Sequence, residues 1–281
     1  MRQGVTSVPG DRLDQWLVSL GHAATKSEAQ AIIMAGRVTV DGRPAEKPGR
    51  RVTSGMAVRV RPRDGGYVSR GGVKLAHALG AFGIDVHGMV AVDLGASTGG
   101  FTDCLLRAGA SRVYAVDVGR GQLAWGLRTD PRVVCLEGIN ARYLSPDQIG
   151  SPCDLVTADL AFISLRLVWR PIMGVLSPGG AVVALVKPQF EAGRDRVGRG
   201  GVVRDPAVHR EVLGTVLEAA RTSGLHPLGV TPSPLAGPAG NLEYLAYLRR
   251  GDGEGQGLAP EALDAAVAQA HARDGRPRSR P

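Results

Sequence analysis

From about residue 68 onward, short apolar runs alternate with helical segments, and this alternation restricts the chain to few folds. Strands are expected near residues 89–94, 112–118, 133–136, 154–159, 181–187, 226–231 and 243–248. Helices are expected between them, at about 72–82, 101–109, 121–128, 163–176 and 206–223. Strands that alternate with helices form a mostly parallel sheet with helices on its faces. Residues 68–250 therefore predict an α/β domain with a seven-stranded, mostly parallel sheet.

The first sixty residues follow a different pattern, that of a small α+β domain. One amphipathic helix is expected after the cap Asp11, with Gly21 as its stop, and Thr25 and Glu28 form a capping box for a second. Two strand-like stretches come next, at residues 38–40 and 57–60. A core this small is marginal alone, so the domain, residues 1–60, is expected to serve a partner.

The positive charge of the chain is concentrated in this small domain. The whole chain has a formal net charge of +8, and residues 1–63 hold eleven Lys and Arg against five Asp and Glu, a net of +6. Although such a run can be a solvated surface, it also suits a polyanion such as RNA. The predicted phosphate-binding residues here are Arg12, Lys26, Arg37, Arg43, Lys47, Arg50 and Arg51.

Composition excludes several classes of protein. The three cysteines have no C-x-x-C spacing and the six histidines are scattered, so neither a metal site nor a disulfide framework is indicated. No window approaches the roughly 18 apolar residues of a membrane span. We expect a cytoplasmic protein, with residues 61–67 as a linker and residues 251–281 as a tail containing one further helix.

The stretch DLGASTGG, residues 93–100, supports two interpretations. Its letters GASTG satisfy the G-x-S-x-G pattern of a hydrolase nucleophile turn, with Ser97 as the nucleophile. In an α/β-hydrolase that turn follows several earlier strands, whereas here it follows the first. The downstream His209 lies in a predicted helix and His226 lies beside a proline, which are poor positions for a triad. The hydrolase interpretation is therefore disfavoured.

The alternative interpretation is a nucleotide-like cofactor. A glycine-rich turn after the first strand brings backbone amides close to a ligand, and Asp117, at the end of the second strand, can accept both ribose hydroxyls. Because the turn lacks the glycine spacing of dinucleotide sites and the lysine of triphosphate loops, S-adenosylmethionine is favoured. The predicted cofactor-binding residues are Asp93, Gly95, Ala96, Ser97, Thr98, Gly99, Gly100, Phe101, Asp117 and Asn140.

Four charged residues are expected near the carboxyl edge of the sheet. Lys187 ends the fifth strand, Asp159 ends the fourth, Glu243 opens the last, and Lys74 lies in the helix before the first. A ribose 2′-hydroxyl is a poor nucleophile, so its methylation needs a positioned base and nearby positive charge. Methylation of a base is less favoured, because ADLAF replaces the usual Pro-Pro element and Cys153 lies on the wrong side of its strand.

The loop at 193–205, GRDRVGRGGVVRD, is expected to be a mobile segment that closes over RNA, although it can also be a plain exposed connector. Its arginines are Arg194, Arg196, Arg199 and Arg204. Arg70, in SRGGVKL, is a further predicted phosphate contact.

Two resemblances extend this interpretation. Residues 11–60 resemble the small RNA-binding domain first recognised in ribosomal protein S-four, with Thr25-Lys26 where that family usually has Ser-Arg. The remainder resembles the FtsJ-type ribose 2′-O-methyltransferases and, more closely, the TlyA family of ribosomal RNA methyltransferases, sometimes labelled haemolysins. The strings that carry this match, within residues 11–248, are VSRGGVKL, DLGASTGGFTD, YAVDVGRGQL, DLAFISL, LVKPQFEAGRDRVGRGGVVRD and GNLEYL.

The resemblance implies a class I, Rossmann-like methyltransferase with a Lys-Asp-Lys-Glu tetrad and no metal. Lys187 would be the base or proton-steering residue, Asp159 its electrostatic partner, and Lys74 and Glu243 would orient the hydroxyl and the lysine. To act as a base Lys187 must lose a proton, which burial and Lys74 favour and the two carboxylates oppose.

The acceptor implied by the resemblance is a cytidine ribose in 23S rRNA within ribosomal subunits. The longer members of the family also act on 16S rRNA. The arm at residues 5–11 and the tail beyond residue 250 favour that dual type.

Two alternatives to this enzyme remain open. One is a non-catalytic RNA-binding or ribosome-assembly factor with the same fold. The other is a membrane-active haemolysin, against which the lack of a suitable amphipathic helix argues.

Overall fold

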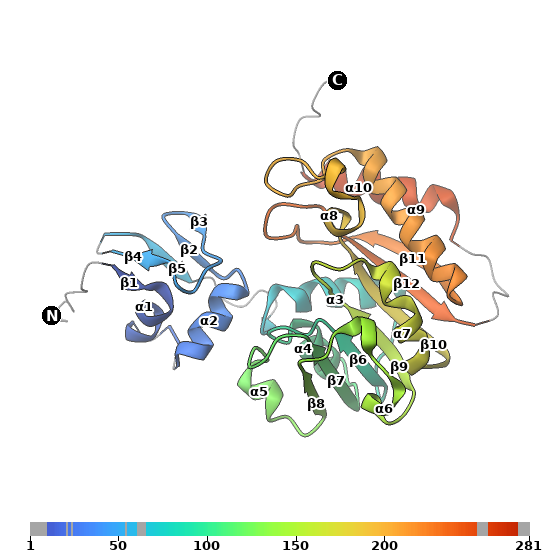
Figure 1. Cartoon of the computed structure of the whole chain (residues 1–281), viewed down its shortest axis with the longest axis horizontal. Helices are drawn as coiled ribbons and strands as arrows, with labels where there is room; N and C mark the ends of the chain where they lie inside the picture. Colours follow the sequence, from blue (N-terminus) through green and yellow to red (C-terminus); the bar gives the residue numbers. More distant parts are fainter. Residues whose placement is uncertain are drawn as a thin grey trace.

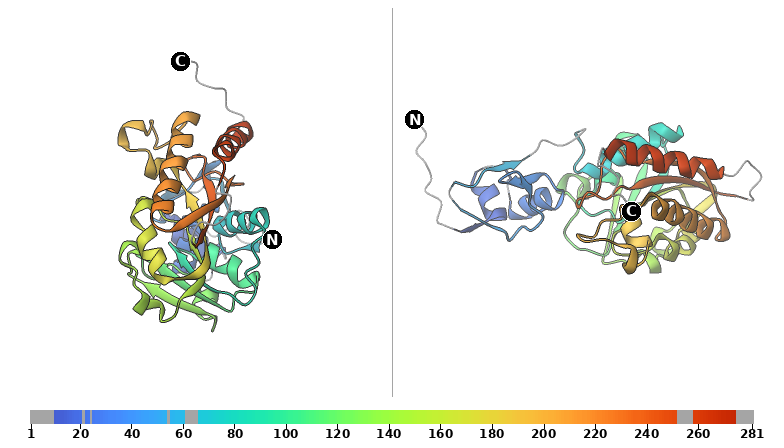
Figure 2. Two further views of the ribbon diagram at one scale, coloured as in Figure 1. Left: turned by 90° about the vertical axis from the view of Figure 1, so that its right-hand side faces the viewer. Right: turned by 90° about the horizontal axis from the view of Figure 1, so that it is seen from above.

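The computed structural model describes residues 10–20, 22–23, 25–53, 55–60, 66–251 and 258–274. Four sequence predictions fall wholly or partly outside the described residues: the helix stop at Gly21, the linker at 61–65, the arm at 5–9 and parts of the tail, 252–257 and 275–281. Figure 1 shows a small N-terminal domain beside a larger one, and Figure 2 shows the same two units from above.

The small domain packs two helices against short strands. Its elements are β1 (Asp11–Arg12), α1 (Leu13–Ser19), α2 (Lys26–Met34), β2 (Val38–Val40), β3 (Arg43–Pro44), β4 (Arg51–Val52) and β5 (Val58–Val60). Leu13, Leu17, Ile33, Val38 and Val40 are fully buried and form its core. β2 pairs antiparallel with both β3 and β5. The predicted α+β organisation is confirmed, and β1, β3 and β4 are additions to it.

The two predicted helix starts in this domain had different outcomes. The hydroxyl of Thr25 accepts a hydrogen bond from the amide of Glu28 at 3.1 Å, which confirms the cap of α2. The expected cap at Asp11 is wrong: Asp11 lies in β1 opposite Val52, and α1 begins without a side-chain cap. Pairing with β4 fixes Asp11 in an extended strand, so its carboxylate does not cap α1.

The large domain is built on a seven-stranded sheet, as predicted. Its strands are β6 (Val90–Leu94), β7 (Arg112–Asp117), β8 (Val133–Glu137), β9 (Cys153–Ala158), β10 (Leu176–Val186), β11 (Leu225–Pro232) and β12 (Tyr244–Arg250). The spatial order is β11-β12-β10-β9-β6-β7-β8. β12 is antiparallel to both of its neighbours, and the pairs among β10, β9, β6, β7 and β8 are parallel. The sheet is therefore mostly parallel, with its order reversing between β6 and β9.

Helices cover both faces of this sheet and make a three-layer α/β/α domain (Figure 1). The helices are α3 (Arg70–Phe82), α4 (Gly100–Arg107), α5 (Trp125–Arg128), α6 (Pro146–Ile149), α7 (Trp169–Val175), α8 (Pro188–Glu191), α9 (Pro206–Thr222) and α10 (Pro260–Asp274). Helices α3 and α4 share a core with Ala91 and Leu155, whereas α7 and α9 pack on the adjacent residues Val92 and Val156. Alternate residues of each strand therefore fill opposite layers.

Two predicted helices are shorter than expected. The segment 163–176 contains a 3₁₀ turn (Leu165–Leu167) and then α7, which starts at Trp169. Pro171 accounts for that start, because proline lacks an amide hydrogen and fits the first turn of a helix. The segment 121–128 is helical only from Trp125, after an extended Ala124.

His209, on α9, forms the buried connection between this helix, β12 and the loop at 193–205. Its ring nitrogens lie 2.8 Å from the hydroxyl of Tyr244 and 3.1 Å from the carbonyl of Val203, and His271 of α10 lies 3.1 Å away. The side chain is fully buried, and this burial lowers the pKa of His209 to about 4. His209 is therefore a structural residue, which agrees with the rejection of a hydrolase triad.

Burial of His209 predicts acid sensitivity. The unfolded imidazole takes a proton near pH 6.5 and the folded one only near pH 4, so the contribution of His209 to the unfolding free energy should fall as the pH drops through that window. The buried carboxyl of Asp93, whose pKa is raised to about 7, contributes in the opposite direction, so the comparison of variants isolates His209. A shift of this size corresponds to roughly 3 kcal/mol. Urea unfolding at pH 7.5 and 4.5 checks this, because His209→Asn should lose most of this pH dependence and the exposed His87→Asn should keep it. Identical pH dependence in all three proteins would contradict the assignment.

Candidate active site at the carboxyl ends of the strands

The four charged residues predicted for catalysis meet at one edge of the sheet as two ion pairs. Lys187 Nζ lies 2.6 Å from Asp159 Oδ1, and Lys74 Nζ bonds Glu243 Oε2. Lys187 and Asp159 directly follow the parallel neighbours β10 and β9, which brings them together. Glu243 precedes β12, whose first residue, Tyr244, lies opposite Val186 of β10.

The two pairs differ in burial. The side chains of Lys74 and Glu243 are 9% and 1% exposed, whereas those of Lys187 and Asp159 are 13% and 23% exposed. Burial would raise the pKa of the Asp159 carboxyl, but the Lys187 and Lys74 charges outweigh it and lower that pKa. Asp159 is therefore held ionised between two lysines. We call Lys187–Asp159 the outer pair, because solvent reaches it more readily, and Lys74–Glu243 the inner pair.

The turn DLGASTGG connects β6 to α4 and passes beside Asp117. The Asp117 carboxylate accepts hydrogen bonds of 2.7 Å from the amides of Ser97 and Gly119. Ser97 adopts a left-handed conformation with φ +48°, and its hydroxyl makes a 3.4 Å contact with Gln122. Ser97 is thus held mainly through its backbone, and no hydrogen bond among the described residues joins it to a histidine.

The residues of this turn that could hold a cofactor do so mainly through their backbone. Asp93 and Phe101 are 0% and 2% exposed; Asp93 accepts bonds from Thr102 and Thr157, and its pKa rises to about 7 because it is buried. Ala96 and Thr98 are also buried. The side chains of Asp93 and Phe101 therefore fill the interior of the domain, so a contact from these two residues to a cofactor would come from their backbone.

The ends of β7 and β8 offer the other side of a cofactor site. Asp117 is partly exposed, and Val118 beside it is 70% exposed, an apolar surface suited to a purine ring. Asn140 is exposed and caps a short 3₁₀ helix by accepting from the amide of Arg142 at 3.0 Å. An acid for ribose hydroxyls, an apolar contact and a glycine-rich turn fit S-adenosylmethionine. Among the described residues, no group of three or more His, Cys, Asp and Glu could hold a metal ion.

The glycines of the turn have internal reasons for being glycine. A Cβ on Gly99 would lie 2.2 Å from Leu127 Cδ1, and one on Gly100 would lie 2.2 Å from Ser69 Oγ. A Cβ on Gly95 would lie 2.6 Å from the carbonyl oxygen of Asp159. The first two positions therefore allow α4 to pack closely on its neighbours, and Gly95 allows the turn to approach the strand end that carries Asp159.

The sequence did not indicate that an exposed aromatic ring, Phe162, packs on Phe190, the ring that lies near Lys187. Phe162 is 92% exposed with φ +63°, and its ring lies 5.1 Å from that of Phe190, which lies 5.9 Å from Lys187 Nζ. Glu191 holds the segment by accepting from Ser164 Oγ at 2.6 Å and from a backbone amide at 2.7 Å. The string DLAFISL contains Phe162, but only the structure reveals its positive φ, its exposure and its contact with Phe190.

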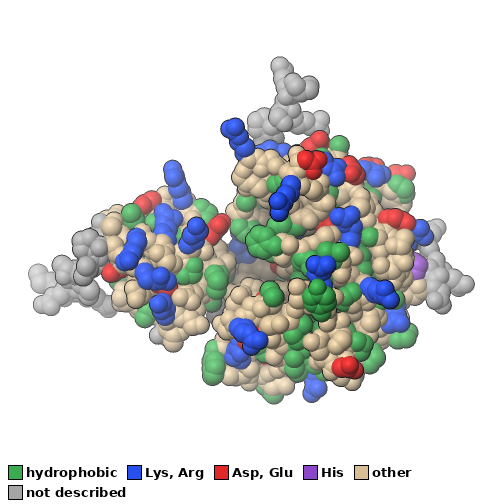
Figure 3. Space-filling model, in the orientation of Figure 1, with side chains coloured by type: hydrophobic (Ala, Val, Ile, Leu, Met, Phe, Trp, Pro, Cys, Tyr) green, Lys and Arg blue, Asp and Glu red, His purple; other side chains and the backbone are tan. Residues whose placement is uncertain are grey.

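The predicted RNA-binding residues of the small domain lie mostly at its surface, where Figure 3 shows Lys and Arg side chains gathered. Lys26, Arg43, Lys47 and Arg51 are exposed, and Arg37 and Arg50 are half-buried. Arg12 is also half-buried and forms a two-bond ion pair with Asp14, at 3.0 and 2.8 Å, so its guanidinium is less available than predicted.

The predicted RNA-binding residues of the large domain lie in two places. Arg194, Arg196, Arg199 and Arg204 are all exposed, and Arg196 pairs with Glu211 at 2.7 Å. Arg70 is half-buried and donates to the carbonyl of Ala236 at 3.0 Å. The structure thus gives Arg70 a role inside the protein.

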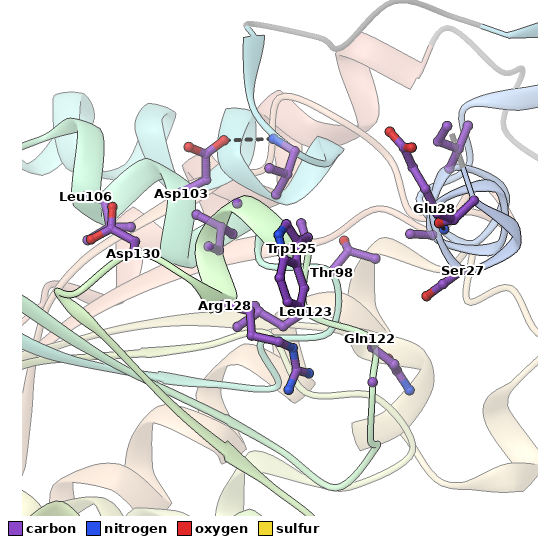
Figure 4. A pocket seen from close by; sticks show the side chains of 18 of the residues that line it. Ser27, Glu28, Thr98, Asp103, Leu106, Gln122, Leu123, Trp125, Arg128 and Asp130 are labelled. Atoms are coloured by element: carbon purple, nitrogen blue, oxygen red, sulfur yellow. Dashed lines mark hydrogen bonds between the residues drawn. The ribbon is translucent and has the colours of Figure 1, made fainter. Parts of the chain in front are cut away.

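A cavity of about 1130 Å³ lies between α2 and the α4–α5 region (Figure 4). Glu28, Thr98, Gln122 and Trp125 are among its lining residues, and Trp125 is 75% exposed. Asp117, Asn140, Asp159 and Lys187 do not line it. This cavity is therefore separate from the edge of the sheet where the charged residues meet.

Comparisons with known proteins show the family to which the chain belongs. Residues 67–250 match the family described as FtsJ-like methyltransferase, and residues 11–58 match the S4 domain. The 16S/23S rRNA (cytidine-2'-O)-methyltransferase TlyA of Mycobacterium tuberculosis is 50% identical over 239 residues, 85% of this chain and 89% of that protein. YqxC of Bacillus subtilis, named as an rRNA methyltransferase, is 45% identical over 93% of this chain and 94% of its own length.

A solved structure gives the same result for the fold. A hemolysin-named protein from Streptococcus thermophilus is 42% identical, with a TM-score of 0.74 over 95% of this chain and 97% of that chain. No helix among the described residues is long and apolar enough to cross a membrane.

Proposed function

Because the chain belongs to the TlyA family, in which an S4 domain precedes an FtsJ-like methyltransferase domain, we propose that it methylates the ribose 2′-hydroxyl of cytidine in rRNA. Its methyl donor is S-adenosylmethionine. The single observation that carries the proposal is the meeting of Lys187–Asp159 and Lys74–Glu243 at the carboxyl edge of the sheet. This arrangement supports the proposal, because it would offer a base, a carboxylate and positive charge to a methyl acceptor.

The proposed roles follow from position and burial. S-adenosylmethionine supplies an electrophilic methyl group when bound, and Asp117, Asn140 and the turn at 95–100 would hold it. Lys187, on the more exposed pair, would be the base or proton-steering group for the 2′-hydroxyl, with Asp159 fixing its ammonium. The buried Lys74 and Glu243 would keep the local charge balanced and orient the hydroxyl and Lys187.

The proposed substrate is rRNA within ribosomal subunits. The relative from Mycobacterium tuberculosis is named for both 16S and 23S rRNA, and the basic surface of the S4 domain suits a phosphate backbone. We propose 23S rRNA as a substrate and 16S rRNA as a second one, with the reaction in the cytoplasm, where ribosomal subunits are found. Lys26, Arg43, Lys47 and the exposed arginines of residues 193–205 would contact phosphates.

Methyl transfer to isolated subunits tests the proposed function. Large and small subunits are incubated with S-adenosylmethionine carrying a labelled methyl group, and the modified nucleotide is mapped by its resistance to alkaline cleavage. Label in a cytidine 2′-O position supports the proposal. Calorimetric binding of S-adenosylmethionine without any transfer to RNA would instead favour a non-catalytic assembly factor.

Phe162 is expected to stack on a base of the RNA near the acceptor ribose. An exposed aromatic ring beside the reacting groups suits an unstacked base, and such a contact is worth about 1–3 kcal/mol. Phe162→Ala should therefore lower kcat/KM for rRNA by roughly tenfold to a hundredfold. Phe162→Trp should retain activity, and the control Leu167→Ala, which truncates an exposed apolar side chain on the same segment, should change little. Equal losses at both positions would contradict stacking by Phe162.

A further inference from the structure

The buried side chain of Asn241 joins two segments that the reaction would use separately. Asn241 is 3% exposed. Its Oδ1 accepts from the amide of Val203 at 3.1 Å, and its Nδ2 donates to the carbonyl of Gly201 at 2.8 Å. Among the described residues, these two hydrogen bonds are the ones that directly join residues 193–205 to residues 233–243. One carboxamide therefore holds the arginine-rich loop against the segment that ends at Glu243.

The arginine-rich loop, residues 193–205, contains a hydrogen-bonded turn that its sequence did not indicate. Gly198 and Val202 form an antiparallel bridge with a 3.1 Å hydrogen bond, which closes a tight turn around Arg199. The side chain of Arg199 is exposed at the tip of this turn, and the Asn241 carboxamide donates to the carbonyl of Gly201 at the end of the turn. A phosphate bound by Arg199 would therefore restrain a short, internally hydrogen-bonded turn that contacts Asn241 at its base.

The other segment, residues 233–243, leads from Asn241 to the inner ion pair. The carbonyl of Asn241 accepts from the amide of Gly237 at 2.8 Å, and the carbonyl of Glu243 accepts from the amide of Ser233 at 2.8 Å. A Cβ on Gly237 would lie 2.7 Å from Glu243 Oε1, so this backbone packs directly on the catalytic carboxylate. A shift of Asn241 would therefore be passed to Glu243 and to its partner Lys74.

The same segment is also tied to the helix that carries Lys74. Arg70, one turn before Lys74 on α3, donates to the carbonyl of Ala236 at 3.0 Å. The segment is thus fixed at α3 by Arg70, at the inner ion pair by Glu243, and at the arginine-rich loop by Asn241. Only the last of these attachments reaches an exposed, positively charged surface.

We propose that Asn241 is a positioning residue that couples RNA held by the arginine-rich loop to the placement of Glu243 and Lys74. The coupling rests on the proposed function for its substrate, an RNA phosphate backbone. RNA bound at Arg199 would restrain the turn at 198–203. The hydrogen bonds of Asn241 would extend this restraint to residues 233–243, so that Glu243 stays positioned to pair with Lys74.

Kinetics of the full-length protein provide the first test. Asn241→Ala should lower kcat on the order of tenfold, because two buried hydrogen bonds are lost, while the dissociation constants of S-adenosylmethionine and rRNA change by less than about threefold. Gln148→Ala is the matched control: it removes an exposed carboxamide whose Oε1 accepts from the amide of Ser145 at 3.0 Å at the start of α6, and it should leave kcat unchanged.

A double variant separates coupling from simple structural support. Arg199→Ala alone should lower kcat and raise KM for rRNA, but in the Asn241→Ala background it should raise KM only. The coupling is supported if the fall in kcat of the double variant is at least about threefold smaller than the product of the two single falls, because the free-energy effects of residues in one network do not add. Fully multiplicative effects would overturn it, because a merely structural Asn241 would leave the contribution of Arg199 unchanged.

Hydrogen–deuterium exchange gives a readout that needs no turnover. Binding of a 23S rRNA transcript should slow exchange in both 193–205 and 233–243 of the wild-type protein, and in Asn241→Ala only in 193–205. Protection of 233–243 that persists in Asn241→Ala overturns the inference. If wild-type protein binds the transcript but transfers no methyl group, the proposed function has failed, and this comparison still decides the role of Asn241.

Discussion

Replacing Lys187 with alanine is expected to reduce methyl transfer to rRNA on the order of a thousandfold. The variant lacks the base or proton-steering group and leaves Asp159 without its 2.6 Å partner. A 2′-hydroxyl then lacks its positioned base, and the developing negative charge faces the Asp159 carboxylate with Lys74, itself paired with Glu243, as the remaining nearby cation. Transfer of labelled methyl groups to isolated ribosomal subunits, measured in single turnover, checks this expectation.

Two controls separate chemistry from folding in this experiment. S-adenosylmethionine should bind Lys187→Ala with nearly unchanged affinity, because Asp117 and the turn at 95–100 are intact. Asp159→Asn should show a loss of similar order, since it removes the other half of the pair. If Lys187→Ala retains more than about a tenth of wild-type transfer, the assigned base is wrong, because positioned proton transfer ordinarily contributes a hundredfold or more.

The inner pair is less suitable for the same test. Lys74 and Glu243 are almost fully buried, so Lys74→Ala leaves an uncompensated carboxylate in the interior, which costs about 3–5 kcal/mol. Loss of activity in that variant would confound catalysis with stability. Lys187 has a more exposed partner in Asp159, and Asp159 keeps a second cation nearby in Lys74. The outer pair therefore gives the clearer result.

The parts of the site that sequence could predict are those fixed by strand ends. Asp159 and Lys187 each follow an apolar run, and parallel neighbours bring such positions together whatever the details of the loops. Lys74 and Glu243 were expected at the same edge, but their pairing with each other was not predicted, because one lies on a helix and the other precedes an antiparallel strand.

The parts that sequence missed depend on contacts between distant segments. Asn241 meets Gly201 and Val203 across about forty residues, and no local pattern marks it. The assignment of Asp93 to the cofactor stays a prediction, but the sequence did not indicate that its carboxylate accepts hydrogen bonds from Thr102 and Thr157 inside the domain. Burial of this kind follows from packing, which a motif does not reveal.

Gly95→Ala is expected to weaken S-adenosylmethionine binding by a hundredfold or more, the second large effect. Gly95 has φ +83°, and a Cβ there would lie 2.6 Å from the carbonyl oxygen of Asp159. Because this neighbour is backbone, no side-chain rotation relieves the clash, and the turn and the end of β9 must move apart. Isothermal calorimetry with S-adenosylmethionine measures the loss of affinity, which exceeds about 2.7 kcal/mol for a hundredfold change.

Gly88→Ala is the matched control, because Gly88 also has a positive φ, +74°, but nothing lies within 4 Å of a Cβ there. Both variants carry backbone strain, and only Gly95→Ala carries the clash. Ser97→Ala should bind the cofactor and transfer methyl groups within a few-fold of wild type, since Ser97 bonds Asp117 through its amide. Equal affinity of Gly95→Ala and Gly88→Ala for S-adenosylmethionine would show that the turn at 95–100 does not bind the cofactor. An inactive Ser97→Ala that still bound the cofactor would make its hydroxyl a reacting group after all.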